Sequence, residues 1–210
     1  MLRRPAALIV TTILLTAAAF VWLAAGRLRT GGIAEPVIVA AIVSALLAAG
    51  IIFTIRARVE GAPLEHHPFL VPGAVLVVAA STAIVSMLGA FLGMAQFLGG
   101  IAAFMGGYCL VGYVALLFGR APVMEWGPGT EFLLLYVAGA GLILTTLLAP
   151  EASASALIIL VLSLAGPALI AGPLGRLLPA HRLLRPLAAG FVIAIPSFIA
   201  VLVAVAQSSS

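Results

Sequence analysis

The chain of 210 residues contains no lysine and no aspartate, and it has a single cysteine. Charged side chains make up only 8% of it, whereas 64% of its residues are hydrophobic. So few charges cannot cover the surface of a soluble domain, which excludes that class and indicates a polytopic membrane protein. The lone Cys109 cannot form an internal disulfide, and its apolar surroundings in the sequence favour a small packed side chain.

Each sign of charge is carried by a single residue type. All ten basic residues are arginine, all six acidic residues are glutamate, and the formal net charge is +4. No more than two basic residues are adjacent, so the pattern predicts no nucleic-acid partner. The arginines instead flank apolar runs, as expected where helices leave a membrane.

The longest uncharged stretch runs from Phe69 to Gly119. One helix needs about 20 residues to cross the hydrocarbon core, so this stretch predicts two helices joined by a tight turn at 93–96. Gly89 and Gly93 form a GxxxG pair, a spacing that lets helix backbones approach closely in lipid. We therefore expect both glycines to pack directly against a neighbouring helix.

The whole pattern predicts an all-α fold, a polytopic membrane helical bundle of about seven transmembrane helices, in a single domain over residues 1–210. The expected spans are about 5–26, 33–55, 69–93, 97–118, 131–148, 152–174 and 186–206. Eight arginines fall on the N-terminal side of these spans, and only Arg27 and Arg29 fall on the other side. This asymmetry predicts a multi-pass protein of the cytoplasmic (inner) membrane with its N-terminus in the cytoplasm.

Common signatures of catalytic, metal and nucleotide sites are absent from the sequence: it has no HExxH, no GxSxG and no phosphate-binding loop. Adjacent His66 and His67 cannot share one helix face, and no nearby residue completes a ligand set, so a solvated loop is expected. The sequence thus predicts no metal and no cofactor.

Two consecutive motifs resemble the YhhN-type family of membrane proteins, which includes the lysoplasmalogenases. A family helix of the form G-L-x-x-S-x-x-G-D matches TAIVSMLGA at Thr82–Ala90, which keeps Ser86 and Gly89. The family's next motif, F-x-x-G-x-x-x-F-x-x-x-H-x-x-Y, begins here at Phe97 and has Tyr108 in the histidine position.

A third stretch late in the chain extends this resemblance. The family's G-A-x-x-F-x-x-S-D matches GFVIAIPSF at Gly190–Phe198, which keeps Ser197. The resemblance implies a YhhN-like fold associated with membrane lipids. Ala90 and Phe198 stand where the family has the aspartates thought to carry hydrolysis, and neither side chain can transfer a proton. The chain is therefore expected to lack the family's hydrolase chemistry.

Polar and motif residues of the spans could line a lipid-sized cavity. The candidate lining residues are Ser86, Ala90, Tyr108, Tyr113, Tyr136, Ser197 and Phe198.

Two other functions stay open at this point. One is an active ether-lipid hydrolase of the lysoplasmalogenase type whose carboxylate is Glu35, Glu125 or Glu131. The other is a small-solute transporter or a structural subunit of a membrane complex, since the spans carry many small residues and no charge at depth. The expected partners are membrane lipids and either a second copy of the chain or another subunit.

Overall fold

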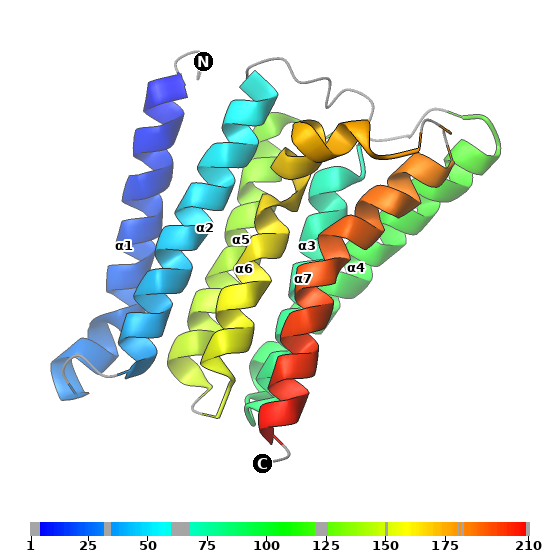
Figure 1. Ribbon diagram of the computed structural model, residues 1–210. Coiled ribbons are helices and arrows are strands. Elements are labelled where there is room, and N and C mark those ends of the chain that lie inside the picture. Colours follow the sequence, from blue (N-terminus) through cyan, green and yellow to red (C-terminus); the bar gives the residue numbers. More distant parts are fainter. Residues whose placement is uncertain are drawn as a thin grey trace.

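The architecture is a helical bundle in which consecutive helices run in opposite directions and the two termini lie at opposite ends (Figure 1). The computed structural model describes residues 5–31, 35–59, 68–120, 126–149, 151–179, 181 and 183–208. Its elements are α1 (Pro5–Gly31), α2 (Glu35–Val59), α3 (Leu70–Leu88), α4 (Leu92–Leu117), α5 (Pro128–Leu148), α6 (Ala154–Ala171), the 3₁₀ helix η2 (Pro173–Arg176) and α7 (Leu184–Ser208). In these residues, seven helices are long and apolar enough to cross a membrane, which confirms the predicted fold class.

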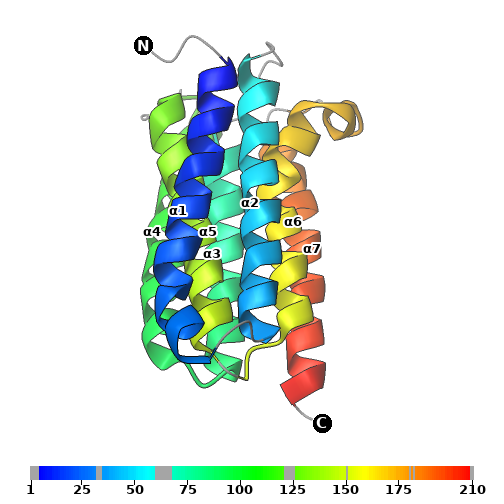
Figure 2. The ribbon, with the colours of Figure 1, turned by 90° about the vertical axis from the view of Figure 1, so that its left-hand side faces the viewer.

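Helices α3 and α6 form the centre of the bundle. Helix α3 contacts α4, α5, α6 and α7, and helix α6 contacts α2, α3, α5 and α7. Helix α1 lies at the edge, where it packs mainly on α2 (Figure 2). Helix α4 lies at another edge and packs mainly on α3.

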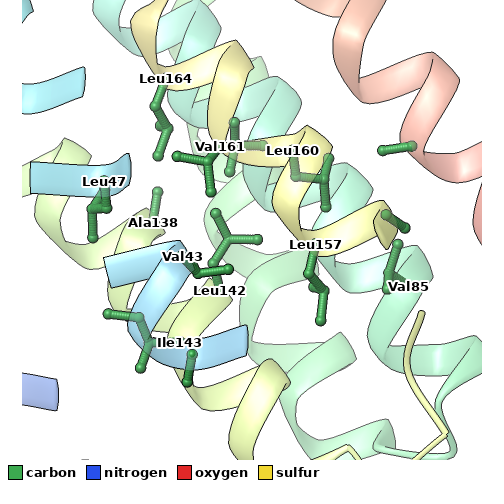
Figure 3. Close-up of a cluster of buried hydrophobic side chains, with 14 of the residues drawn as sticks. Val43, Leu47, Val85, Ala138, Leu142, Ile143, Leu157, Leu160, Val161 and Leu164 are labelled. Atoms are coloured by element: carbon green, nitrogen blue, oxygen red, sulfur yellow. The ribbon is translucent and has the colours of Figure 1, made fainter. Parts of the chain in front are cut away.

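The main core is built from aliphatic side chains of α2, α3, α5 and α6 (Figure 3). Leu142 and Leu160 are both fully buried in this core. Because lipid tails are as apolar as leucine, close packing rather than water exclusion holds such helices together. Glycine supports this packing: a Cβ on Gly141 would lie 2.6 Å from the Leu98 side chain.

The predicted turn at 93–96 is wrong. Helix α3 ends at Leu88 and α4 begins at Leu92, so the turn lies over residues 89–91. The amide of Phe91 donates to the Ser86 carbonyl (2.8 Å) and the amide of Ala90 donates to the Met87 carbonyl (3.2 Å). This pair of bonds is a Schellman motif, which ends a helix with one residue of positive φ. Ala90 takes that conformation at φ 58°.

The predicted packing of both glycines of the GxxxG pair against a neighbouring helix is wrong: only Gly89 is closely packed, and it meets the connection between α5 and α6. A Cβ on Gly89 would lie 2.9 Å from the backbone nitrogen of Ala152. A Cβ on Gly93 would have no atom within 4 Å. The two residues flank the turn rather than sharing one helix, so the four-residue spacing does not place them on a common face.

Several helix ends differ from the predicted spans. Helix α1 continues to Gly31 and α2 to Val59, so both include arginines that the sequence placed in loops. Arginine can extend its side chain along a helix end to reach water, so a helix need not stop at it. Pro167 lies inside α6 and Pro196 inside α7, whereas Pro173 begins η2. His66, His67 and Glu125 lie outside the described residues.

Candidate functional site

The candidate serines make hydrogen bonds between helices. Ser86 of α3 lies 2.9 Å from the Thr145 hydroxyl of α5. Thr145 donates to the carbonyl of Gly141 (2.9 Å), so the proton between the two hydroxyls comes from Ser86. Ser197 of α7 lies 2.8 Å from the hydroxyl of Ser163 of α6. All four hydroxyl residues are buried, and these bonds satisfy them inside the bundle.

The candidate tyrosines join peripheral elements of the bundle. The Tyr136 hydroxyl donates to the carbonyl of Leu15 (2.8 Å) and ties α5 to α1. The Tyr113 hydroxyl donates to the carbonyl of Leu183 (3.3 Å), which ties α4 to the segment before α7. Tyr108 packs against Trp126, with ring centroids 5.0 Å apart and planes at 86°.

The two positions aligned with the family's aspartates both face outward. Ala90 is exposed in the turn between α3 and α4. Phe198 is 66% exposed on α7. The structure therefore does not gather the seven candidate residues around one cavity, because they take part in separate contacts or none.

Glu131 is the carboxylate most removed from solvent in the described residues. It lies in the first turn of α5 and is only 8% exposed. Glu35 begins α2 and is exposed, and Glu151 is exposed after α5. Within the described residues, no group of three or more His, Cys, Asp or Glu side chains could hold a metal.

A small hollow lies between the beginnings of α3 and α7. It is lined by Phe69, Leu70, Pro186, Ala189, Gly190 and Ile193. Its free volume is about 10 Å³, enough for roughly one water molecule and far too little for a whole lipid. Several lining residues are partly exposed, so the hollow opens toward the outside of the bundle.

Sequence reasoning missed Arg185, at the start of α7 beside this hollow. Its Nε is buried and has no hydrogen-bond partner in the described part of the chain. The sequence carried a signal for this position: Arg185, Ala189 and Ile193 are spaced by four residues and share one helix face.

Comparison with known protein families, with curated proteins and with solved structures found no match.

Proposed function

We propose that this chain is a lipid-associated integral membrane protein with a YhhN-like helix frame and without the family's hydrolase chemistry. The outward placement of Ala90 and Phe198 supports the absence of hydrolase chemistry. Hydrolysis of a vinyl ether needs a positioned acid or base, and losing one such group typically costs about 10²–10⁴-fold in rate. Neither residue can transfer a proton, and neither faces a shared cavity.

The test is aldehyde release from lysoplasmalogen by the purified chain in detergent. The proposal expects no release above background. It also expects none from the Ala90→Asp/Phe198→Asp double variant, because the two carboxylates would not face one substrate. Robust turnover by the unmodified chain that is abolished by Glu131→Gln would instead establish a hydrolase with a relocated carboxylate. Glu35→Gln serves as the control, since Glu35 is exposed at the opposite end of the bundle.

We further propose that the chain lies in the cytoplasmic membrane with its N-terminal end in the cytoplasm. Four arginines lie at or next to helix ends on the same side of the bundle as the N-terminus, namely Arg56, Arg120, Arg176 and Arg185, whereas Arg29 lies at the other end. An excess of arginine marks the cytoplasmic side. Labelling with an impermeant thiol reagent in a Cys109→Ser background tests this orientation. Gln207→Cys should react from outside intact cells, and His181→Cys should not.

Self-association within a membrane complex is a second candidate, and helix α4 favours it. Only 11% of this helix is buried in the bundle, the lowest fraction of the seven. Phe97 and Phe104 project outward from it at 57% and 65% exposure. A Cβ on Gly100 or Gly107 would meet nothing within 4 Å. Phenylalanine and glycine thus alternate on one outer face, a surface that a second α4 could match.

Disulfide cross-linking tests this candidate in native membranes, again in a Cys109→Ser background. Gly100→Cys should form covalent dimers if two α4 helices meet. Leu162→Cys, on the exposed side of α6, is the matched control and should remain monomeric. Equal cross-linking at both positions would indicate random collision and remove the support for this candidate.

A further inference from the structure

The hollow between α3 and α7 has an apolar lining, and Arg185 directly precedes the lining residue Pro186 on α7. Ala189 and Ile193 are both 1% exposed, and they face Leu70 of α3. Arg185 stands one helical turn before Ala189 on the same face of α7. A helical side chain points back toward the N-terminus of its helix, so Arg185 extends from the hollow toward the membrane surface.

The guanidinium of Arg185 has hydrogen-bonding capacity that the described protein does not use. Its Nε is removed from solvent yet has no hydrogen-bond partner among the described residues. A buried N–H without an acceptor is costly, and such groups in native structures call for a specific explanation. Arginine presents planar, fixed donors that match the oxygens of a phosphate, so a phosphate ligand would supply the missing acceptor.

Other groups at this end make the surroundings electropositive and ordered. His181 accepts a hydrogen bond from the backbone amide of Leu183 through Nδ1 (3.3 Å), and its carbonyl accepts from the amide of Arg185 (3.0 Å). These bonds fix the first turn of α7 before Arg185. Arg176, exposed on η2, adds a second cation at the same end of the bundle. The positive end of the α7 dipole also favours an anion here.

The hollow is too small to enclose an acyl chain, but its apolar lining offers a surface over which one can lie. Gly190 lines the hollow, and a Cβ there would meet nothing within 4 Å, so the missing side chain leaves a notch on this face of α7. Leu70, Ala189 and Ile193 belong to a small cluster that is separate from the main core. An acyl chain lying along this notch would pack against the outer side of this cluster. Its phosphate would then lie at the level of Arg185, nearer the membrane surface.

We propose that Arg185 and the hollow beside it form a binding site for an anionic phospholipid, with the phosphate on the guanidinium and an acyl chain over Gly190. This site rests on the lipid association proposed above and gives it a location. The charge of the headgroup decides the preference, because the basic end of the bundle disfavours the cationic part of a zwitterionic headgroup.

The test compares lipids of equal chain length that differ in headgroup charge. The full chain is purified, delipidated in detergent, and titrated with phosphatidylglycerol or phosphatidylcholine while bound lipid is counted by native mass spectrometry. One arginine near a membrane surface contributes a preference of about fivefold. We therefore expect phosphatidylglycerol to bind about fivefold more tightly to the parent, and Arg185→Gln to abolish that preference. Arg56→Gln, which removes an exposed arginine at the same end, should leave most of it.

A second pair of variants tests the apolar part. Gly190→Leu fills the notch and should weaken binding of both lipids, whereas Gly107→Leu, at an open position on α4, should not. Glycerol phosphate, which lacks acyl chains, should compete poorly. Equal competition by glycerol phosphate would identify a site for a small phosphate and overturn the lipid assignment.

The proposal is also overturned if Arg185→Gln keeps the headgroup preference or if Arg56→Gln loses as much of it. The comparison of Arg185→Gln with Arg56→Gln keeps the test valid even if Gly190→Leu fails to fold. Aldehyde release is measured on the same samples. A hydrolytically active chain with Arg185-dependent lipid preference would refute the proposed lack of hydrolase chemistry and leave this site standing.

Discussion

Gly89 lies against Ala152 so closely that a Cβ on Gly89 would be 2.9 Å from the Ala152 backbone nitrogen and 3.0 Å from its Cα. Gly89 caps the end of α3, and Ala152 belongs to the connection between α5 and α6. Two connections at the same end of the bundle therefore meet through a residue without a side chain. The contact is mainly with backbone atoms, which cannot rotate away as a flexible side chain could.

Gly89→Ala should destabilise the protein by about 1–3 kcal/mol, because the added methyl group overpacks a contact with backbone. Gly93→Ala should change stability by no more than about 0.5 kcal/mol, since its methyl group would meet nothing and lies away from any packed contact. Thermal unfolding in detergent, followed by the loss of monomeric protein, measures both. Equal melting temperatures for the two variants would show that the Gly89 contact does not constrain the fold.

Ala90 and Gly119 occupy the same position in two Schellman motifs. After α4, the amide of Gly119 donates to the Leu116 carbonyl (3.0 Å) and the amide of Arg120 to the Ala115 carbonyl (2.9 Å). Gly119 has φ 71°, a conformation that costs glycine little, whereas Ala90 adopts φ 58° with a Cβ.

Ala90→Gly should therefore raise stability by up to about 1 kcal/mol. The left-handed conformation costs an L-residue about 1–2 kcal/mol, and the larger entropy of an unfolded glycine offsets about 0.4–1 kcal/mol of the gain. Gly119→Ala is the reciprocal variant and should lower stability by a similar amount. A loss of stability in Ala90→Gly would mean that the Ala90 methyl group makes a contact outside the described protein, such as with lipid or another subunit.

Composition and hydropathy predicted the fold class because membrane helices must satisfy their backbone groups internally and be apolar over a fixed length. The position of the turn was not predictable from the same information. Gly93 is by residue type a better turn former than Ala90, and the contact of Gly89 with a connection that is distant in sequence is not visible in the pattern.

The candidate site was harder to predict than the fold. Ser86 and Ser197 are buried inside the bundle, but a hydroxyl that bonds another helix and one that lines a cavity look the same in a sequence. In the sequence, Arg185 is only one of the eight arginines on the N-terminal side of the spans. Its importance depends on which face of α7 packs against α3, and one sequence without that contact does not reveal it.

The bond between Ser163 and Ser197 lies beside prolines in both of its helices. Pro167 cannot donate to the Ser163 carbonyl, and Pro196 likewise leaves the Val192 carbonyl without its helical partner. The two proline-containing helices are joined at this level by the only hydroxyl pair between α6 and α7 among the described residues. We expect each of Ser163→Ala and Ser197→Ala to destabilise the protein by about 1 kcal/mol, because the remaining hydroxyl loses its partner in an apolar setting.

The double variant Ser163→Ala/Ser197→Ala should cost less than the sum of the single variants, with a coupling of about 0.6 kcal/mol, since removing both partners leaves no unsatisfied group. Ser163→Ala combined with Ser44→Ala is the control, because Ser44 bonds the Ala40 carbonyl of its own helix (2.7 Å) and those two losses should add. The four-variant cycle is measured by reversible unfolding in mixed micelles. Additivity in the Ser163/Ser197 cycle would mean that the two hydroxyls satisfy themselves elsewhere, for instance on the carbonyls that the prolines release, and that the bond does not hold α6 to α7.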